Sequence, residues 1–285
     1  MPRPHLQHLH LPGLTPYRTA QALQSSLVRA FLSHKHTPST PLPPPTLLTF
    51  TPPPIYTTGR RELPSSYPPS LVSTLRAPLE SNTSGADFTP ASRGGLITFH
   101  GPGQLVIYPT ISLNHPPSFE KPISPRCYVS LLESATIRTL AHYGVEGFRT
   151  ADPGVWVTPR HNRQIGLQDA EGVEGAPAIS GAEKKIAALG VHLRRNITSY
   201  GVGLNVSTDL RWFDRIVACG IEGKGVTSLA EEGVVGKTLG EVAGVWVGAF
   251  GEEVGAEVRG VEEGEVLEQL GVGRLEDLEG GGDGV

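Results

Sequence analysis

The most unusual segment of the sequence is residues 93–104, which read Arg93-Gly94-Gly95-Leu96-Ile97-Thr98-Phe99-His100-Gly101-Pro102-Gly103-Gln104. Its adjacent glycines let the backbone approach a ligand closely, because they carry no side chains. We predict two short strands, Leu96–Phe99 and Leu105–Tyr108, joined by a turn that the glycines and the proline force. The segment lacks the spacing of a phosphate-binding P-loop, and no dinucleotide-binding fingerprint follows a predicted strand.

Helices are expected where a capping residue or a proline precedes an apolar stripe. Thr15-Pro16 predicts a helix over 16–33, with Thr15 as its N-cap. Ser124-Pro125 repeats this signal for a helix that stops at Gly144. The capping box Thr238-Leu239-Gly240-Glu241 opens a third helix.

Further strands are predicted from short apolar runs between turn residues. They lie at Leu47–Phe50, Gly154–Val157, Gln164–Leu167, Ile186–Leu193 and Ile197–Val206. Asp209 is expected to cap a short helix that carries Trp212 and Phe213. Because strands and helices mix without a regular βαβ alternation, we predict the α+β class, a two-layer domain with a mixed sheet packed with helices.

The chain is expected to hold one main domain with extensions at both ends. This domain occupies residues 13–255, with Pro/Ser-rich loop insertions at 36–54, 62–92 and 169–181. Residues 1–12 are expected to be a frayed N-terminus or a short targeting segment. Residues 256–285 form an acidic C-terminal extension, and its last six residues are expected to be disordered.

Composition and charge exclude several functional classes. A formal net charge of −4, with 18% charged residues, does not fit a basic nucleic-acid-binding protein. No run approaches the roughly 18 consecutive apolar residues of a membrane-spanning helix. The two cysteines cannot form a disulfide framework. Charge is uneven, since residues 1–61 hold six basic and no acidic residues, whereas residues 231–285 hold three basic and 14 acidic ones.

Cys219 and Lys185 are the first candidates for chemistry. Cys219 lies in a glycine-bearing loop that a substrate can approach, but a thiol needs a nearby base or cation to act as a nucleophile. Lys185 enters an apolar strand, where a partly desolvated amine can transfer protons. Taken alone, these residues favour structural roles: Cys219 as a small buried residue, and Lys185 as a solvated lysine at a sheet edge.

Other candidates are weaker. Cys127 is assigned to packing, although it stands near the start of a predicted helix. His100 is an acid–base group, a hydrogen-bonding pocket residue or, most simply, a turn residue. No cysteine and histidine spacing suggests zinc, and no metal site is predicted.

Several segments, taken in order, resemble the lipoyl (octanoyl) transferases of lipoate biosynthesis. They are Pro54–Arg61, residues 93–104, Gly154–Val157, Lys185–Val191, Gly201–Val206, Ala218–Ile221 and Val226–Leu229. The resemblance covers about residues 7–250, and its most specific block ends at Gln104. The resemblance favours catalytic roles for Cys219 and Lys185 over these structural roles.

This resemblance implies an activity, a fold and a set of site residues. Enzymes of the family move an octanoyl group from acyl carrier protein to a lysine of lipoyl domains, in 2-oxoacid dehydrogenase and glycine-cleavage complexes, without a cofactor. Their fold is that of the catalytic domain of biotin and lipoate protein ligases. The nucleophile that carries the thioester falls on Cys219, and the lysine beside it falls on Lys185 rather than Lys184. The acyl-binding residues fall on Arg93, Gly94, Gly95, Leu96, Ile97, Thr98, Phe99, His100, Ala188, Leu189, Gly190, Gly201, Val202 and Gly203.

The chain departs from the family pattern at a few positions. Tyr200 stands where most members have histidine, Gly203 replaces alanine, and Ala218 replaces the proline before the nucleophile. We expect Gly201 and Gly203 to leave room for an alkyl chain. Backbone N–H groups near Gly94-Gly95 or Gly220 are candidates for stabilising an oxyanion.

Partners and compartment follow from the same resemblance. It implies octanoyl-acyl carrier protein as donor, lipoyl domains as acceptors, a monomer and a mitochondrial location of fungal type, with a cytoplasmic location as the alternative. A basic face is expected to dock the acidic carrier, formed by Arg194, Arg195, Arg211 and Arg215. Two other functions stay open: an ATP-dependent lipoate or biotin protein ligase of the same fold, and a non-catalytic protein that binds acyl carrier protein or a lipoyl domain.

Overall fold

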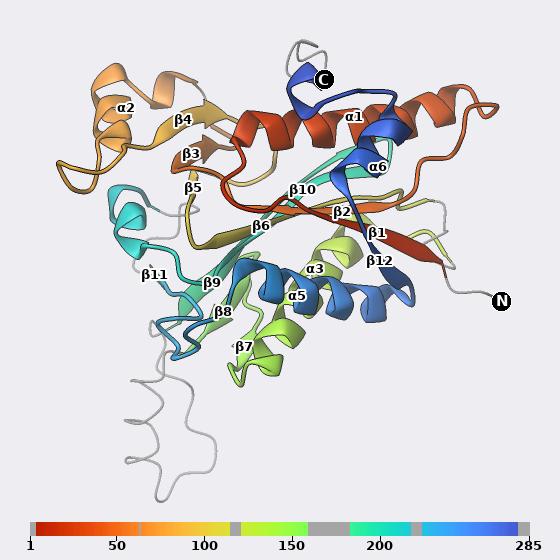
Figure 1. Cartoon of the computed structure of the whole chain (residues 1–285). Helices are drawn as coiled ribbons and strands as arrows, with labels where there is room; N and C mark the ends of the chain where they lie inside the picture. Colours follow the sequence, from red (N-terminus) through yellow and green to blue (C-terminus); the bar gives the residue numbers. More distant parts are fainter. Residues whose placement is uncertain (1–3, 63, 115–120, 159–182, 218–223, 279–285) are drawn as a thin grey trace, which may run out of the picture.

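The computed structural model describes residues 4–62, 64–114, 121–158, 183–217 and 224–278. In these ranges a large mixed sheet has helices on both faces, and a smaller sheet lies beside one end of it (Figure 1). The α+β class expected from the sequence is confirmed. The predicted strand Gln164–Leu167 and the predicted loop 169–181 lie outside the described residues.

The large sheet has the strand order β12-β1-β2-β6-β10-β9-β8-β7, and β11 pairs with β9. Strand β1 runs parallel to both of its neighbours, whereas the ladder from β2 through β6, β10, β9 and β8 to β7 is antiparallel. The bounds are β1 (His5–His10), β2 (Thr46–Phe50), β6 (Gln104–Thr110), β7 (Gly147–Phe148), β8 (Val155–Val157), β9 (Lys184–Arg194), β10 (Ile197–Asn205), β11 (Gly225–Val226) and β12 (Glu257–Val261).

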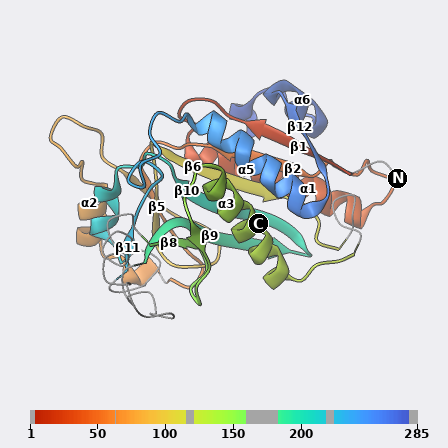
Figure 2. The same ribbon diagram turned by 90° about the horizontal axis from the view of Figure 1, so that it is seen from below.

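Both faces of the central strands are buried under helices. Helices α1 (Tyr17–His36) and α6 (Glu263–Leu270) cover one face, whereas α3 (Pro125–His142) and α5 (Leu239–Val254) cover the other (Figures 1 and 2). Consecutive side chains of a strand point to opposite faces, so Leu47 packs on the α3/α5 side and Leu48 on the α1/α6 side. This double burial explains why the central strands read as continuous apolar runs.

The smaller sheet is built from the segments around residues 93–104. It has the order β4-β3-β5, with β3 (Ile55–Thr58), β4 (Asp87–Pro90) and β5 (Thr98–His100). Short helices flank it, namely η1 (Pro64–Ser66), α2 (Pro69–Arg76) and η2 (Leu210–Arg215). Phe99 of β5 stacks on Trp212 of η2, with ring centroids 5.1 Å apart. Because β5 belongs to this sheet and β6 to the large one, the turn between them carries the chain from one sheet to the other.

Glycine is required in that turn. Gly103 has φ +81°, and a Cβ atom there would lie 2.5 Å from the carbonyl carbon and oxygen of Ser207. Only glycine accepts both the left-handed conformation and the close contact. The strand–turn–strand prediction is therefore confirmed, although the two strands pair with different sheets.

The N-caps of the helices are the residues predicted from the sequence, with one exception. Ser124 Oγ accepts a hydrogen bond from the Cys127 N–H, and Thr238 with Glu241 forms the predicted capping box. Asp209 caps η2 as expected. Helix α1 instead has Pro16 as its N-cap, without a side-chain capping hydrogen bond, and the Thr15 N–H donates to the Thr51 carbonyl oxygen.

Regular structure also replaces several segments that were expected to be irregular. The N-terminal residues expected to be frayed contribute β1, which lies between β2 and β12. The strand expected at Leu47–Phe50, within the Pro/Ser-rich stretch 36–54, is confirmed as β2, whereas the expected loop 62–92 contains η1, α2 and β4. The C-terminal extension supplies β12, α6 and η4 (Leu275–Leu278), whereas its final residues lie outside the described ranges. These elements pair with distant segments, and short windows of sequence hold no signal of such pairing.

A glycine-to-alanine pair tests the packing of the central strands. A Cβ atom at Gly201 in β10 would lie 2.3 Å from the carbonyl oxygen of Ile107, whereas one at Gly248 on the exposed side of α5 meets nothing within 4 Å. Gly201→Ala should therefore lower the free energy of unfolding by about 2 kcal/mol or more. Gly248→Ala should raise it by about 0.5–1 kcal/mol, and urea unfolding measures both. Equal effects would contradict the described packing.

Candidate active site

A cavity opens where strand β9 loses one of its partners. Strand β10 pairs with β9 over Ala187–Arg194, but β8 pairs with it only over Lys184–Ala187. Beyond Ala187 the loop Arg93–Leu96 lies along the β9 edge, and the Gly94 N–H donates to the Val191 carbonyl oxygen at 3.0 Å. The resulting β9 cavity has a volume of about 480 Å³, within the usual range for small-molecule sites.

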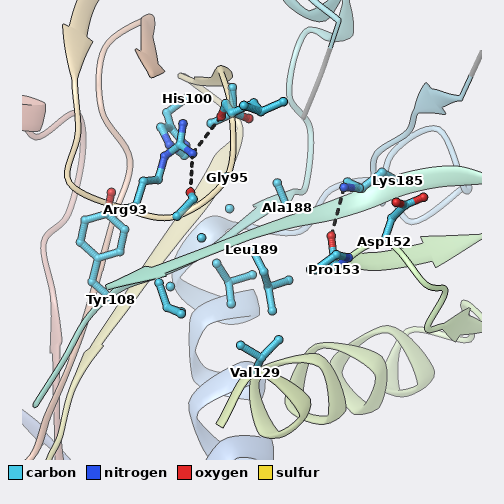
Figure 3. Close-up of a pocket in the computed structure, with 18 of the residues that line it drawn as sticks. Arg93, Gly95, His100, Tyr108, Val129, Asp152, Pro153, Lys185, Ala188 and Leu189 are labelled. Carbon is cyan, nitrogen blue, oxygen red and sulfur yellow. Dashed lines mark hydrogen bonds between the residues drawn. The ribbon is translucent and has the colours of Figure 1, made fainter. Parts of the chain in front are cut away.

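The β9 cavity is elongated and largely apolar. Lys185 lies at one end, Arg93 and Tyr108 lie at the other, and Ala188 and Leu189 lie between them (Figure 3). The full lining is Arg61, Arg93, Gly94, Gly95, Leu96, Thr98, His100, Tyr108, Val129, Asp152, Pro153, Lys185, Ala188, Leu189, Gly190, Val191, Gly201, Val202 and Gly203.

Most residues expected to bind an acyl chain line this cavity. Ile97 and Phe99 are the exceptions, and both belong to the apolar cluster around Tyr56 and Trp212 instead. The alternation of side chains along the strand explains the difference, because Thr98 and His100 face the cavity and the intervening Phe99 faces away. Ile97 and Phe99 are therefore supporting residues and not lining residues.

Arg93 lines the cavity but uses its guanidinium to hold the chain together. The Nη1 group donates to the carbonyl oxygens of Gly94 and Leu96 at 3.0 and 2.9 Å. The Nη2 group donates to the carbonyl and hydroxyl oxygens of Thr57, and Nε donates to the same hydroxyl. These five hydrogen bonds match the five N–H donors of a guanidinium, so Arg93 fixes the loop shape and keeps no donor for a ligand.

His100 is held in one tautomer by a chain of side-chain amides. Gln104 Nε2 donates to the Phe99 carbonyl and to Asn205 Oδ1, which leaves Gln104 Oε1 facing His100 Nδ1 at 2.6 Å. Asn205 Nδ2 in turn donates to the Thr227 carbonyl at 3.0 Å. We assign the proton to Nδ1, because Oε1 can only accept. The His100 Nε2 atom is then a buried acceptor without a partner in the described part of the chain.

The imidazole of His100 is neutral at physiological pH. Burial lowers its pKa to about 4, and the nearby Arg93 charge acts in the same direction, while the hydrogen bond to Gln104 opposes them. A neutral ring whose free nitrogen is an acceptor can receive a hydrogen bond from a ligand. His100 is thus suited to hydrogen bonding in the pocket, and not to acting as a general acid near neutral pH.

Lys185 is buried, with 6% of its surface exposed, whereas the neighbouring Lys184 is exposed. Its Nζ donates to the Pro153 carbonyl oxygen at 3.1 Å and lies 4.7 Å from the centre of the Trp156 ring. An ammonium over an indole face is attracted by the negative potential of the ring. The alternation of β9 therefore turns Lys185 inward, as the resemblance implied, and the reading of two solvated edge lysines is wrong for Lys185.

The neighbouring Gly154 makes room for this lysine. Gly154 has φ +133°, and a Cβ atom there would lie 3.1 Å from Lys185 Cε and 2.8 Å from the Ala187 carbonyl oxygen. Lys224 also lies 4.7 Å from the Trp156 ring centre and pairs with Asp152 at 3.6 Å. The segment Gly154–Val157 thus packs around the side chain of Lys185.

The glycines of β9 and β10 serve the packing of the chain itself. A Cβ atom at Gly190 would lie 3.0 Å from Arg93 Cδ, and one at Gly203 would lie 3.1 Å from Gln104 Oε1. A Cβ atom at Gly201 would meet the Ile107 carbonyl oxygen. Both Gly201 and Gly203 also line the cavity, and the expectation that they leave room for an alkyl chain stays a prediction.

The remaining expectations concern the two cysteines and the donors for an oxyanion. Cys219 lies outside the described residues, as do Ala218 and Gly220. Cys127 is exposed at the start of α3, so its assignment to packing is wrong. The Gly94 N–H is already bonded to Val191, which removes it from the oxyanion candidates.

The expected basic face of four arginines does not form one surface. Arg194 and Arg195 lie at the β9–β10 turn, at the opposite end of β9 from Lys184. Arg211 instead pairs with Asp209 and Glu80, and Arg215 donates to carbonyl oxygens of residues 74–78. The side chains of Arg211 and Arg215 are therefore engaged within the chain.

Sequence reasoning missed some lining residues. Arg61 ends the matching segment Pro54–Arg61 and Pro153 precedes Gly154–Val157, so position in the sequence was an available signal for both. Tyr108 and Val129 were expected only as parts of a strand and a helix, and nothing local distinguishes them from core residues. Asp152 and Val191 complete this set.

Two features are absent from the described residues, a metal-binding cluster and a membrane-spanning helix. No group of three or more histidine, cysteine or acidic side chains is arranged to hold a metal ion there. Within the same ranges, no helix combines the length and apolar character that crossing a bilayer requires.

Comparison with known proteins identifies the family. The family described as "Lipoyl protein ligase A/B catalytic domain" matches residues 16–251. A probable octanoyltransferase of Schizosaccharomyces pombe is 40% identical over 222 residues, which cover 78% of this chain and 83% of the relative. The mitochondrial octanoyl-[acyl-carrier-protein]:protein N-octanoyltransferase of Danio rerio is 40% identical over 224 residues, covering 79% and 81%.

Solved structures share the fold. The bipartite lipoate protein ligase of Thermoplasma acidophilum superposes with a TM-score of 0.65 at 15% identity, covering 98% of this chain and 92% of that chain. A lipoate-protein ligase A bound with ATP gives a TM-score of 0.60 at 15% identity, covering 96% and 93%. At this identity the likeness concerns the fold alone.

The chain belongs to the lipoyl protein ligase A/B catalytic domain family. Within that family its curated relatives are octanoyltransferases, and the chain is an acyltransferase. The family and the enzyme class implied by the sequence motifs are thereby confirmed.

The depressed pKa of His100 predicts an acid-sensitive contribution to stability. Between pH 6.5 and about 4 the unfolded chain binds a proton that the native ring does not, so stability falls as pH falls through this window. The difference corresponds to roughly 3 kcal/mol. His100→Gln should flatten the pH dependence of unfolding in this range, whatever its effect at pH 7.

Urea unfolding between pH 4 and 7 measures this slope. The control is His36→Gln, at an exposed position at the end of α1, and it should keep the wild-type slope. Identical slopes for wild type and His100→Gln would contradict the buried neutral histidine.

Proposed function

We propose that the protein transfers an octanoyl group from acyl carrier protein to the target lysine of a lipoyl domain, through a thioester on Cys219. The observation that carries this proposal is the β9 cavity, which is apolar along Ala188 and Leu189 and ends at the buried ammonium of Lys185. In it an acyl chain can lie along β9 while its carbonyl group reaches the lysine.

The dimensions and energetics of the cavity suit an eight-carbon chain. Lys185 and Gly190 are five residues apart on β9, which spans roughly 16 Å at about 3.3 Å per residue. This length accepts an extended octanoyl group. Burying each methylene contributes about 0.8 kcal/mol, so the chain supplies roughly 5 kcal/mol of binding.

In the first step, the Cys219 thiolate attacks the thioester carbonyl of the donor. A new carbon–sulfur bond forms on Cys219, and the carrier sulfur leaves and takes a proton. The Lys185 ammonium stabilises the thiolate and supplies that proton. One thioester replaces another, so the step is nearly balanced and needs no ATP.

In the second step, the amine of the acceptor lysine attacks the acyl group on Cys219. Lys185, now an amine, takes the proton that this nitrogen loses as the amide bond forms. Lys185 keeps this proton as an ammonium and the Cys219 sulfur departs as a thiolate, which restores the starting ion pair. Conversion of a thioester to an amide is downhill.

His100 and Arg93 shape the site for these steps. The free Nε2 of His100 is left as an acceptor for a polar group of a bound substrate. Arg93 holds the loop Arg93–Leu96 against β9, which keeps the cavity open in the absence of a ligand. A preformed site lowers the cost of ordering the acyl chain.

The setting proposed for this activity is the mitochondrion. The relatives from Danio rerio and Xenopus tropicalis carry that compartment in their names, and the relative from Schizosaccharomyces pombe supports a fungal lineage. The donor is octanoyl-acyl carrier protein, the acceptors are lipoyl domains, and the enzyme acts as a monomer.

Intact-protein mass spectrometry tests the proposal. Incubation with octanoyl-acyl carrier protein, without ATP, should add about 126 Da, since an octanoyl group replaces one hydrogen. Cys219→Ser should show no adduct, whereas Cys127→Ser, the matched exposed control, should show the full one. Lys185→Met should slow adduct formation by roughly 10²- to 10⁴-fold, the usual contribution of a positioned proton-transfer group.

Each alternative function gives a different result in this experiment. An adduct that survives in Cys219→Ser would place the nucleophile elsewhere. Labelling of a lipoyl domain from octanoate only when ATP is present would identify a ligase. Binding of the carrier with neither adduct nor labelling would identify a non-catalytic binding protein.

A further inference from the structure

Asp152 gives the β9 cavity a negative charge at the end where the acyl carbonyl is proposed to lie. Among the described residues that line this cavity, no other carries a carboxyl group. Asp152 lies at the Lys185 end (Figure 3), and the residue after it, Pro153, accepts the hydrogen bond from Lys185 Nζ. No step of the proposed transfer uses this carboxylate. Its place beside the reacting end of the cavity therefore needs an explanation of its own.

The carboxyl group of Asp152 is held only loosely by the chain. Its Oδ2 atom pairs with Lys224 Nζ at 3.6 Å, and the side chains of Asp152 and Lys224 are 42% and 27% exposed. Residue 152 is instead fixed by its backbone, since its N–H donates to Thr150 Oγ1 and its carbonyl oxygen accepts from Trp156 Nε1. In the part of the chain that the structure describes, Oδ1 has no hydrogen bond or ion pair. The carboxylate can therefore bind a ligand without loss of a contact that orders the backbone.

The surroundings of Asp152 are otherwise positively charged. The Nζ atoms of Lys185 and Lys224 each lie 4.7 Å from the ring centre of Trp156. A further cation that came to this place would be repelled by Lys224, and by Lys185 whenever it is protonated, because like charges repel strongly in a partly desolvated site. Asp152 supplies the opposite charge that offsets this repulsion.

Octanoyl transfer brings one cation to this end of the cavity. With the acyl carbonyl at Lys185, the donor arm and the acceptor side chain both approach from the Lys185 end. The arm of an acyl carrier protein bears neutral thioester and amide groups and an anionic phosphate, which a carboxylate repels. The side chain of the acceptor lysine has an ordinary pKa near ~10.4, so it arrives from neutral solution as an ammonium. The acceptor is thus the substrate whose charge Asp152 complements.

We propose that Asp152 binds the ε-ammonium of the acceptor lysine and holds it beside the acyl group. This inference rests on the proposed octanoyl transfer and adds a residue that recognises the acceptor. The ammonium donates charge-assisted hydrogen bonds to the carboxylate oxygens and displaces Lys224 from its long contact with Oδ2.

Binding at Asp152 precedes the chemical step and does not replace any part of it. The bound ammonium loses one proton to solvent, to which the Asp152 carboxylate is open. The resulting amine attacks the acyl carbonyl, and its second proton goes to Lys185 as the amide bond forms. Because a carboxylate stabilises the charged form of the acceptor lysine, Asp152 contributes to acceptor binding and not to activation of the nucleophile.

Single-turnover transfer from preformed octanoyl-enzyme tests this inference. Each enzyme is loaded with octanoyl-acyl carrier protein, and a lipoyl domain is then added over a range of concentrations. Asp152→Asn keeps the size of the side chain and removes its charge. This variant should load within about twofold of the wild-type rate, but should need about tenfold more lipoyl domain for half-maximal transfer, with the maximal rate within about threefold. The control Asp214→Asn removes a charge from an exposed position outside the cavity, and should match wild type in both steps.

Hydroxylamine separates recognition of the acceptor charge from damage to the site. It is uncharged at neutral pH, and it cleaves the same thioester to octanoyl hydroxamate and the free Cys219 thiol. Octanoyl-loaded Asp152→Asn should react with hydroxylamine at the wild-type rate. A defect of about tenfold with the lipoyl domain but not with hydroxylamine supports the inference. Equal losses with both acceptors, or no loss with either, overturn it.

Calorimetry with the lipoyl domain needs no turnover and keeps this test independent of the proposed function. Wild type and Asp152→Asn are each titrated with the native domain and with a domain whose target lysine is replaced by glutamine, which completes a double-mutant cycle. Wild type should bind the native domain about tenfold more tightly than the glutamine form, and Asp152→Asn should bind both alike. The same preference in both enzymes would overturn the inference. If wild type formed no octanoyl adduct, the proposed function would fail, while this cycle would still decide on Asp152.

Discussion

Lys185 provides the constraint around which the rest of the site is arranged. A buried ammonium must keep hydrogen-bond acceptors or a favourable electrostatic contact, since its desolvation is otherwise costly. The chain supplies the Pro153 carbonyl oxygen and the face of Trp156, and it places Gly154 where any larger residue would strike the lysine stem. These groups lie just before and within β8, whose short pairing with β9 leaves the rest of the β9 edge to the cavity. The short strand β8 therefore holds the Lys185 ammonium in place, and its pairing ends where the apolar part of the β9 cavity begins.

The opposite end of the β9 cavity is formed where the chain passes from one sheet to the other. Residues 93–104 run from the loop against β9, through β5 of the small sheet, into β6 of the large sheet. Arg93 holds the loop with all five of its donors, and Gln104 holds His100 in one tautomer. The polar groups of this segment are therefore bonded within the chain, and the orientation of the cavity wall is set before any ligand arrives. Such preorganisation suits an enzyme that binds a flexible acyl chain.

Much of this could be predicted from sequence, and the exceptions have physical reasons. Local signals placed the capped helices and the turn before Gln104, because capping and glycine conformation depend on a few adjacent residues. The inward orientation of Lys185 rather than Lys184 came from the motif that follows it, and strand alternation explains it. Strand β1 and helix α2 were missed, since they are fixed by partners far away in sequence. The same limit applied to Tyr108 and Val129, which the fold alone brings to the cavity. The resemblance implied Phe99 as a lining residue, but the alternation of β5 turns it toward Trp212.

The central claim is that the acyl chain lies along β9 with its carbonyl group at Lys185. A crystal structure of the acyl-enzyme, prepared with octanoyl-acyl carrier protein and no acceptor, tests this claim most directly. The account predicts alkyl density between Ala188, Leu189 and Val129, with the thioester carbonyl within hydrogen-bond reach of Lys185 Nζ. An acyl chain left in solvent, or bound elsewhere while the β9 cavity stays unfilled, would contradict it.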